Sequence, residues 1–381
     1  MSWLTLSTTA LARLRHRAQP MAMGLHLGEE RLNLVQFESV AGALRLRAAA
    51  ALAYPVPRAD LLAQPGRWRA WLRGRLAEHH FAGRRVVTCL PANQVRLFPV
   101  HCPLAPGQSA EAAIMQALRE RLQGEIASSV VDYLPIRSDD AATDCSDALA
   151  AVAPREAVLG HLQLMEAGGL NPVALEVGPG ALARLVAMVN VADGRVDYPH
   201  VLVINFGRQS SHVSVVWGRR LVLDREIDFA EAVLVQRVAS VLELSPEMAR
   251  RLLVTKGLGA GGADAGEAGP APHDSEMAQT LGEVLRPEIA LLMAEINKTL
   301  VYTASRSRGR GIDQIYLLGS VAQYTGVSSL LQQQLKVPVQ VLDPLRTFPG
   351  ALGAAARAPL APLAGMAVAA GLALREAPRH A

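Results

Sequence analysis

The sequence predicts an α/β protein of two domains, each built from strands that are followed by helices. Three observations carry this prediction. Residues 22–52 read as three apolar strands separated by glycine-containing turns, and residues 201–227 repeat that pattern. Each meander is followed by helical segments and further apolar strands, as is typical of α/β domains. A chain of 381 residues is also long enough for two domains that each bury a core.

The first half is expected to continue with a helix over 59–80 and a fully buried strand over 86–90. Ser109 stands where a helix N-cap is expected, before a run rich in Ala, Ile, Met and Leu. The other elements expected in this half are a helix over 109–122, strands over 130–136 and 148–152, a helix over 158–167, a strand over 172–177 and a helix over 181–190.

The second half is expected to contain a long helix and a flexible segment. Residues 257–272 are rich in Gly and Ala, which favours a mobile loop. The regular elements expected around it are helices over 229–243, 246–256, 275–305 and 327–335 and strands over 201–206, 213–217, 221–227, 312–318 and 337–342. Ligands of open α/β sheets bind beyond strand ends, so a site is expected in the cleft between the halves.

Composition excludes several classes of function. Aromatic residues make up 4% of the chain, too few for a single-strand nucleic-acid binder built on stacking platforms. Cys89, Cys102 and Cys145 form no CxxC pair, and the ten histidines form no metal-binding grouping. We therefore expect no metal site, no nucleic-acid partner and a reducing cytosolic environment, although the net charge of +4 is mildly basic.

Two segments bear on membrane association. Residues 2–20 combine Leu and Trp with three arginines, which fits either a frayed tail or a weak basic amphipathic helix on the inner leaflet. Residues 363–374 are apolar but shorter than the ~20 residues of a spanning helix, so they read as a buried helix. Membrane contact is therefore expected only through a partner or through the N-terminal tail.

Three short motifs resemble those of actin-like ATPases. Residues 23–28 (Met-Gly-Leu-His-Leu-Gly), 203–207 (Val-Ile-Asn-Phe-Gly) and 317–320 (Leu-Leu-Gly-Ser) resemble the phosphate-1, phosphate-2 and adenosine motifs in order and spacing. Further segments narrow the resemblance to PilM-like proteins of type IV pilus machines, and it covers about residues 20–376. These segments are 245–249 leading to Lys256-Gly257, 312–319, 337–344 and 366–375.

The resemblance implies a two-domain actin/Hsp70-like (ribonuclease-H-like) fold with subdomains 1A, 1C, 2A and 2B and an interdomain cleft. The organisation that follows is an N-terminal tail over 1–20, domain I over 21–197 with an inserted subdomain at about 97–150, domain II over 198–356 with a mobile loop at about 257–273, and a C-terminal helix over 357–376 that returns to domain I.

The resemblance also implies a function and a location. PilM-like proteins lie in the cytosol, peripheral to the inner membrane, and bind the short cytoplasmic N-terminus of the inner-membrane protein PilN. They thereby connect the pilus alignment complex to the cytosolic motor. We expect the same type of partner here, a PilN-like protein, together with other alignment and motor proteins.

The residues that hold Mg²⁺-ATP in the ATP-binding members are changed here. His26 and Asn205 replace two Asp residues, and Asn33 replaces a Lys. Glu29 and Glu30 stand in the phosphate turn at positions of small hydroxyl residues. Two like charges 4 Å apart repel by about 4 kcal/mol at an effective dielectric near 20, so these carboxylates oppose phosphate binding. Neither His nor Asn is a good ligand for a hard cation.

We therefore predict a pseudo-ATPase scaffold, not an enzyme, with ATP and Mg²⁺ as the alternative cofactors. Turn amides and hydroxyls could still hold an anion. The candidate nucleotide-binding residues are Gly28, Asn33, Asn205, Gly207, Arg208, Ser210, Ser211, Gly319 and Ser320. Each also has a plainer interpretation: Gly28 and Gly207 as hairpin glycines, and the two serines as ordinary polar strand residues.

Two other functions remain open on the sequence. An active ATPase or sugar-kinase-like enzyme would need a metal-holding carboxylate, for which Asp224, Glu226 and Asp228 are the nearby candidates. A membrane-tethered filament protein similar to FtsA would use residues 2–14 as its anchor, although FtsA-type proteins carry their amphipathic helix at the C-terminus.

Overall fold

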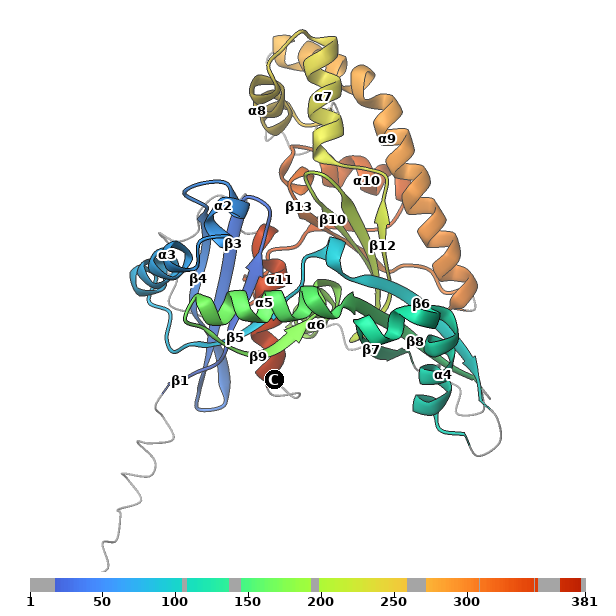
Figure 1. Cartoon of the computed structure of the whole chain (residues 1–381). Helices are drawn as coiled ribbons and strands as arrows, with labels where there is room; N and C mark the ends of the chain where they lie inside the picture. Colours follow the sequence, from blue (N-terminus) through green and yellow to red (C-terminus); the bar gives the residue numbers. More distant parts are fainter. Residues whose placement is uncertain are drawn as a thin grey trace, which may run out of the picture.

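A six-stranded sheet forms the centre of domain I (Figure 1). Its strands are β1 (Gln19–Pro20), β2 (Met23–Leu27), β3 (Arg31–Val40), β4 (Ala43–Ala53), β5 (Arg85–Cys89) and β9 (Asn171–Glu176). β4 pairs with β3 along its whole length, so β1 and β2 share the other edge of β3. β5 and β9 run parallel to β2. The main order is therefore β4-β3-β2-β5-β9.

The sheet of domain II repeats this order. Its strands are β10 (His200–Phe206), β11 (Ser211–Trp217), β12 (Arg220–Ile227), β13 (Gln314–Gly319) and β14 (Val339–Val341), in the order β12-β11-β10-β13-β14. The first three strands are antiparallel neighbours, and β13 and β14 run parallel to β10. In both sheets a meander of three strands is thus followed by two parallel strands. The predicted actin/Hsp70-like fold is confirmed.

The computed structural model describes residues 18–104, 108–136, 145–192, 199–258, 272–307, 309–345, 347–348 and 364–377. Three expectations fall partly outside these ranges. Of the N-terminal tail predicted over 1–20, residues 1–17 lie outside, while Gln19–Pro20 form the short, exposed strand β1. Residues 259–271 of the predicted mobile loop and 357–363 of the predicted C-terminal helix also lie outside the described residues.

Two helices cover one face of the domain I sheet. They are α3 (Pro65–Glu78) and α5 (Arg155–Ala167), and the short α2 (Arg58–Leu62) precedes them. The single helix predicted over 59–80 is wrong because Gln64, the residue before Pro65, adopts φ −116° and ψ 88°, away from the helical region that a following proline disfavours. Trp68 is fully buried in this layer, and its indole N–H donates to the Leu164 carbonyl at 3.0 Å.

The opposite face of the domain I sheet is covered by α6 (Gly178–Ala192) and by α11 (Ala367–Ala373). Every residue of α11 is buried, and short 3-10 turns flank it at Ala364–Met366 and Leu374–Glu376. Glycines permit the close packing: a Cβ on Gly371 would lie 2.0 Å from the Ala181 carbonyl oxygen, and one on Gly24 would lie 1.9 Å from that of Ala369. No helix in the described ranges is long and apolar enough to cross a bilayer.

A small α/β subdomain is inserted after β5. Its sheet has the order β6-β8-β7, with β6 (Arg96–Pro103), β7 (Ser129–Ile136) and β8 (Cys145–Pro154), and α4 (Ala110–Leu122) packs on it. The strand β6 was not predicted, because Pro99 and Pro103 interrupt its pattern; β6 tolerates them as an edge strand. Ser109 does cap α4, since its hydroxyl accepts from the Ala112 N–H at 3.2 Å.

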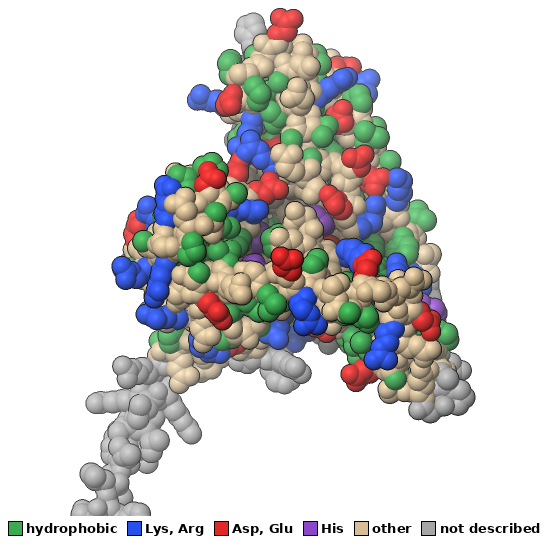
Figure 2. Space-filling view, viewed as in Figure 1, with side chains coloured by type: hydrophobic (Ala, Val, Ile, Leu, Met, Phe, Trp, Pro, Cys, Tyr) green, Lys and Arg blue, Asp and Glu red, His purple; other side chains and the backbone are tan. Residues whose placement is uncertain are grey.

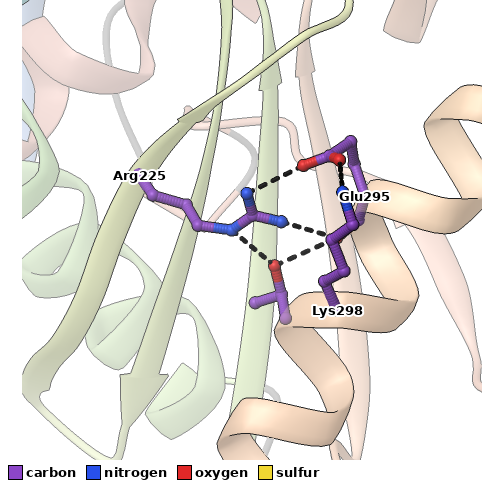
Figure 3. A network of polar contacts seen from close by, with 4 residues as sticks. Arg225, Glu295 and Lys298 are labelled. Atoms are coloured by element: carbon purple, nitrogen blue, oxygen red, sulfur yellow. Dashed lines mark hydrogen bonds and ion pairs between the residues drawn. The ribbon is translucent and has the colours of Figure 1, made fainter.

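Domain II carries the remaining helices, α7 (Glu231–Val241), α8 (Pro246–Lys256), α9 (Pro272–Arg306) and α10 (Val327–Leu335). Arg225 of β12 fastens the long helix α9 to the sheet (Figure 3). Its guanidinium donates to the Glu295 carboxylate at 2.8 Å, to the Glu295 carbonyl at 2.6 Å and to the Thr299 hydroxyl at 3.0 Å. At the far end of α9, Arg306 pairs with Asp147 of the inserted subdomain at 3.1 Å. Domain II therefore contacts the inserted subdomain through its longest helix.

Candidate functional site

The first turn of the candidate site connects β2 to β3 in domain I. A Cβ on Gly28 would lie 2.8 Å from the Arg31 carbonyl oxygen, so the tight turn requires a glycine. The Gly28 carbonyl accepts from the Tyr54 hydroxyl at 3.2 Å and from Arg58 at 3.1 Å. Asn33 is buried behind this turn, 5% exposed. Its predicted role in nucleotide binding stays a prediction.

The equivalent turn of domain II connects β10 to β11. A Cβ on Gly207 would lie 1.9 Å from the Ser210 carbonyl oxygen. The first turn of α7 holds this loop, because the Glu231 N–H donates to the Gly207 carbonyl at 3.1 Å and the Ala232 N–H donates to the Arg208 carbonyl at 3.0 Å. Ser210 is half-buried, and Ser211 is fully buried, with a hydroxyl that has no hydrogen-bond partner in the described part of the chain.

The end of β13 supplies the third predicted motif. Gly319 adopts φ +84°, and a Cβ there would lie 2.0 Å from the Phe206 carbonyl oxygen, so glycine is required. The backbone N–H of Ser320 donates to that carbonyl at 2.9 Å, and its hydroxyl does so at 3.3 Å. Gly319 and Ser320 therefore lie against the end of β10, beside the turn that contains Gly207.

An ion pair joins the two turns across the cleft. Glu30 of the domain I turn pairs with Arg208 of the domain II turn, and its other carboxylate oxygen lies 4.0 Å from Arg250 of α8. Figure 2 shows acidic and basic side chains together where the two lobes meet. Arg208 was predicted to contact a phosphate, and the structure places a carboxylate from the opposite domain against it.

A buried carboxylate lies behind this ion pair. Glu231, which is 1% exposed, accepts from Arg250 Nε at 3.0 Å and from the Tyr324 hydroxyl at 2.7 Å. Burial and the Glu231 carboxylate raise the pKa of Tyr324, so the phenol stays protonated and donates. Sequence reasoning missed Arg250, Glu231 and Tyr324, because they come from three separate elements and no spacing in the chain brings them together.

A cavity of about 540 Å³ lies between the β11–β12 face of domain II and the inserted subdomain. His26 and Asn205, which replace the two Asp residues of the ATP-binding pattern, both line it. Burial, followed by the charge of Arg58, lowers the pKa of His26 to about 4. The imidazole is therefore neutral at pH 7 and offers no positive charge to an anion.

The carboxylates considered for metal binding are placed differently from one another. Asp224 is buried and accepts from the Ser214 hydroxyl at 2.6 Å, and it lies 3.3 Å from His212 Nδ1. Burial opposes protonation of His212, but the hydrogen bond and charge of Asp224 outweigh it and raise the pKa. Glu226 and Asp228 are exposed. Among the described residues, no group of three or more His, Cys, Asp or Glu side chains could hold a metal ion.

A second cavity, of about 920 Å³, is a groove between the inserted subdomain, domain I and one turn of domain II. We call it the β7 groove, because Val130 and residues 132–135 of β7 form one side of it. Its apolar wall includes Val130, Leu134, Val158, Leu162, Leu175 and Leu374, and its charged residues are Asp132, Glu176, Arg184, Arg219, Arg220 and Arg375. Sequence reasoning named no pocket residues for a partner.

Several solved structures are similar to this chain. The structure described as "PilM-PilN type IV pilus biogenesis complex" matches with a TM-score of 0.71 and 24% identity, covering 93% of this chain and 98% of that chain. EutJ from Carboxydothermus hydrogenoformans, an ethanolamine utilization protein, matches with a TM-score of 0.45 and 16% identity over 93% of this chain and 89% of its own. MreB5 of Spiroplasma citri bound to ADP matches with a TM-score of 0.43 and 12% identity over 86% and 93%.

A family model decides the relationship. The model described as type IV pilus assembly protein PilM matches residues 108–377, which is more than half of the chain. The match runs from the inserted subdomain through the whole of domain II to α11. It agrees with the likeness in fold to the structure described as a PilM-PilN type IV pilus biogenesis complex. This chain belongs to the family of the type IV pilus assembly protein PilM.

Proposed function

We propose that this chain is a cytosolic scaffold of a type IV pilus assembly machine that binds the cytoplasmic N-terminus of a PilN-like inner-membrane protein without hydrolysing ATP. Its family and the PilM-PilN complex to which its fold is similar support a PilN-like partner. The β7 groove is the observation that carries the proposal. Through this partner the protein would be held at the inner membrane, between the alignment complex and the motor.

The β7 groove suits a short extended peptide. β7 pairs with β8 on one side and is the edge strand of its sheet, so its other side is available for strand addition. Apolar side chains of α5 and α6 line the opposite wall of the groove, where they can contact every second side chain of an extended peptide. Val130 of β7 is 38% exposed although it is apolar, which is expected of a position that a partner covers.

The walls of the β7 groove come from three parts of the chain. The inserted subdomain contributes β7, domain I contributes α5, α6 and the residues after α11, and domain II contributes the β11–β12 turn. A peptide in the groove would therefore contact both domains. This arrangement supports a scaffold whose partner stabilises one relative position of the domains.

The chemistry of the cleft supports a pseudo-ATPase. His26 and Asn205 are poor ligands for Mg²⁺, and Arg208 is paired with Glu30. Asn33, which replaces the phosphate-binding lysine, is buried and uncharged. The residues present therefore fit Mg²⁺-ATP poorly, and no hydrolytic step can be derived from them.

The experiment is a calorimetric titration of the full chain with a synthetic peptide of the PilN-like N-terminus, repeated with Val130→Asp. A peptide can bury only the 38% of Val130 that is still exposed, but the carboxylate of the variant would have to leave water without a partner. That costs about 1–3 kcal/mol or more, so the variant should bind at least about tenfold more weakly. Val301→Asp is the matched control, because Val301 is also an exposed valine, 72% exposed, and lies on α9. It should bind the peptide like the wild type.

Two results would count against the proposal. A wild-type chain that does not bind the peptide, or a Val130→Asp loss that Val301→Asp reproduces, would remove the β7 groove as the partner site. Hydrolysis of Mg²⁺-ATP by the same preparation, measured as phosphate release, would refute the pseudo-ATPase part while leaving the peptide site standing.

A further inference from the structure

We propose that the Glu30 carboxylate is an internal anion that occupies, and thereby masks, an anion site formed by Arg208 and Arg250. The inference rests on the proposed function in one respect, since both require that the cleft binds no nucleotide while the protein acts as a scaffold.

The geometry places one anion between two cations. Glu30 belongs to the domain I turn, whereas Arg208 and Arg250 belong to the β10–β11 turn and to α8 of domain II. One carboxylate oxygen pairs with Arg208, and the other lies 4.0 Å from Arg250. Both oxygens of the carboxylate are therefore directed at guanidinium groups of the opposite domain.

Both arginines are held in place from behind. The backbone of Arg208 is fixed by the first turn of α7, through the N–H groups of Glu231 and Ala232. Arg250 is held by its Nε, which donates to the buried Glu231, and its Nη2 lies 4.0 Å from Glu30. Glu231 is in turn fixed by the Tyr324 hydroxyl. The backbone of Arg208 and the guanidinium of Arg250 are therefore positioned by domain II itself, independently of Glu30.

Such a pair of arginines selects an anion by charge and geometry. The planar guanidinium presents N–H donors that match carboxylate and phosphate oxygens alike. Glu30 supplies the carboxylate from within the chain, so a phosphate from solution must displace it and also overcome its repulsion. The ligand class of the unmasked site is accordingly a phosphate or polyphosphate.

The internal anion should be replaceable. Side chains of Glu30 and Arg208 are 45% and 46% exposed, and ion pairs with that exposure are weak because water and salt screen them. Removing the charge of Glu30 should therefore leave the fold intact and free both guanidinium groups. We expect the affinity for inorganic tripolyphosphate to rise at least about tenfold, which corresponds to ~1.4 kcal/mol.

The test is a calorimetric titration of the full chain with inorganic tripolyphosphate at low salt. The variants are Glu30→Gln, Glu30→Ser and Glu30→Gln combined with Arg208→Gln. Glu29→Gln is the matched control, because Glu29 is the neighbouring exposed carboxylate of the same turn and its loss changes the net charge equally. Thermal melting of each variant checks that it is folded. If Glu30→Gln does not fold, Glu30→Ser still tests the proposal.

The proposal expects both Glu30 variants to bind tripolyphosphate at least about tenfold more tightly than wild type and Glu29→Gln, and expects Arg208→Gln to cancel the gain. It is overturned if Glu29→Gln gives the same gain, since net charge alone would then explain it. It is equally overturned if folded Glu30 variants bind no better than wild type. Peptide binding to the β7 groove, measured on the same samples, reports separately on the scaffold function.

Discussion

Gly371→Ala should destabilise domain I, because α11 packs too closely on α6 to admit one more methyl group. The added Cβ would lie 2.0 Å from the Ala181 carbonyl oxygen, against more than about 3 Å in ordinary contacts, and both atoms belong to helix backbones or lie next to them. Overpacking of this kind costs up to about 3 kcal/mol. Alanine regains about 1 kcal/mol of helix propensity. The expected net loss is therefore up to about 2 kcal/mol.

The matched control is Gly160→Ala in α5. Gly160 is also a helical glycine, but a Cβ there meets no atom within 4 Å, so the variant should gain about 1 kcal/mol. The assay is urea unfolding followed by tryptophan fluorescence, with Trp3 and Trp217 replaced by Phe so that Trp68 and Trp71 report on domain I. Equal stability of the two alanine variants would refute the packing argument.

Two further predictions concern pH and the attachment of α9. Burial lowers the pKa of His161 from 6.5 to about 4. Between these two pH values the unfolded chain binds a proton that the folded chain does not. The free energy of unfolding should therefore fall by up to about 1.4 kcal/mol for each pH unit as the pH decreases. Urea midpoints between pH 7 and pH 4 should therefore depend less on pH in His161→Phe, and an unchanged slope would contradict this. Arg225→Met should cost about 2 kcal/mol at pH 7 by removing the hydrogen bonds to α9. Hydrogen bonds from Lys298 and Arg225 lower the pKa of Glu295, so this carboxylate stabilises the fold above its unfolded pKa and loses that stabilisation on acidification. The stability of Arg225→Met should therefore fall less than that of the wild type as pH is lowered. Equal acid sensitivity of the two proteins would show that Lys298 alone suffices.

The fold could be predicted from local patterns because both sheets begin with a meander that the sequence punctuates with glycines. The strands of residues 22–52 and 201–227 are found close to their predicted bounds, and so is the strand before Gly319. The failures have local causes. Pro65 ends one helix and starts another, and prolines in β6 conceal an edge strand that a single sequence cannot distinguish from a loop.

The candidate site was predictable only in its backbone. Gly28, Gly207 and Gly319 lie at close approaches that demand glycine, and their spacing in the sequence indicates this. Glu30 and Arg208 stood out in the sequence, but their pairing was not predictable. Arg250 and Glu231 were missed altogether, because these side chains meet only through the packing of separate elements. The residues of the β7 groove were hidden for the same reason, since they come from three parts of the chain.

The position of α11 has a consequence for biosynthesis. This helix covers the inner face of a sheet whose first main strand, β2, begins at Met23, so more than three hundred residues separate the strand from its cover. During translation the apolar surface of the domain I sheet around Gly24 therefore stays uncovered until α11, up to Ala373, has left the ribosome. Domain II, whose strands and helices are all made earlier, can complete its own core first. The nascent chain should therefore depend on chaperones for domain I in particular.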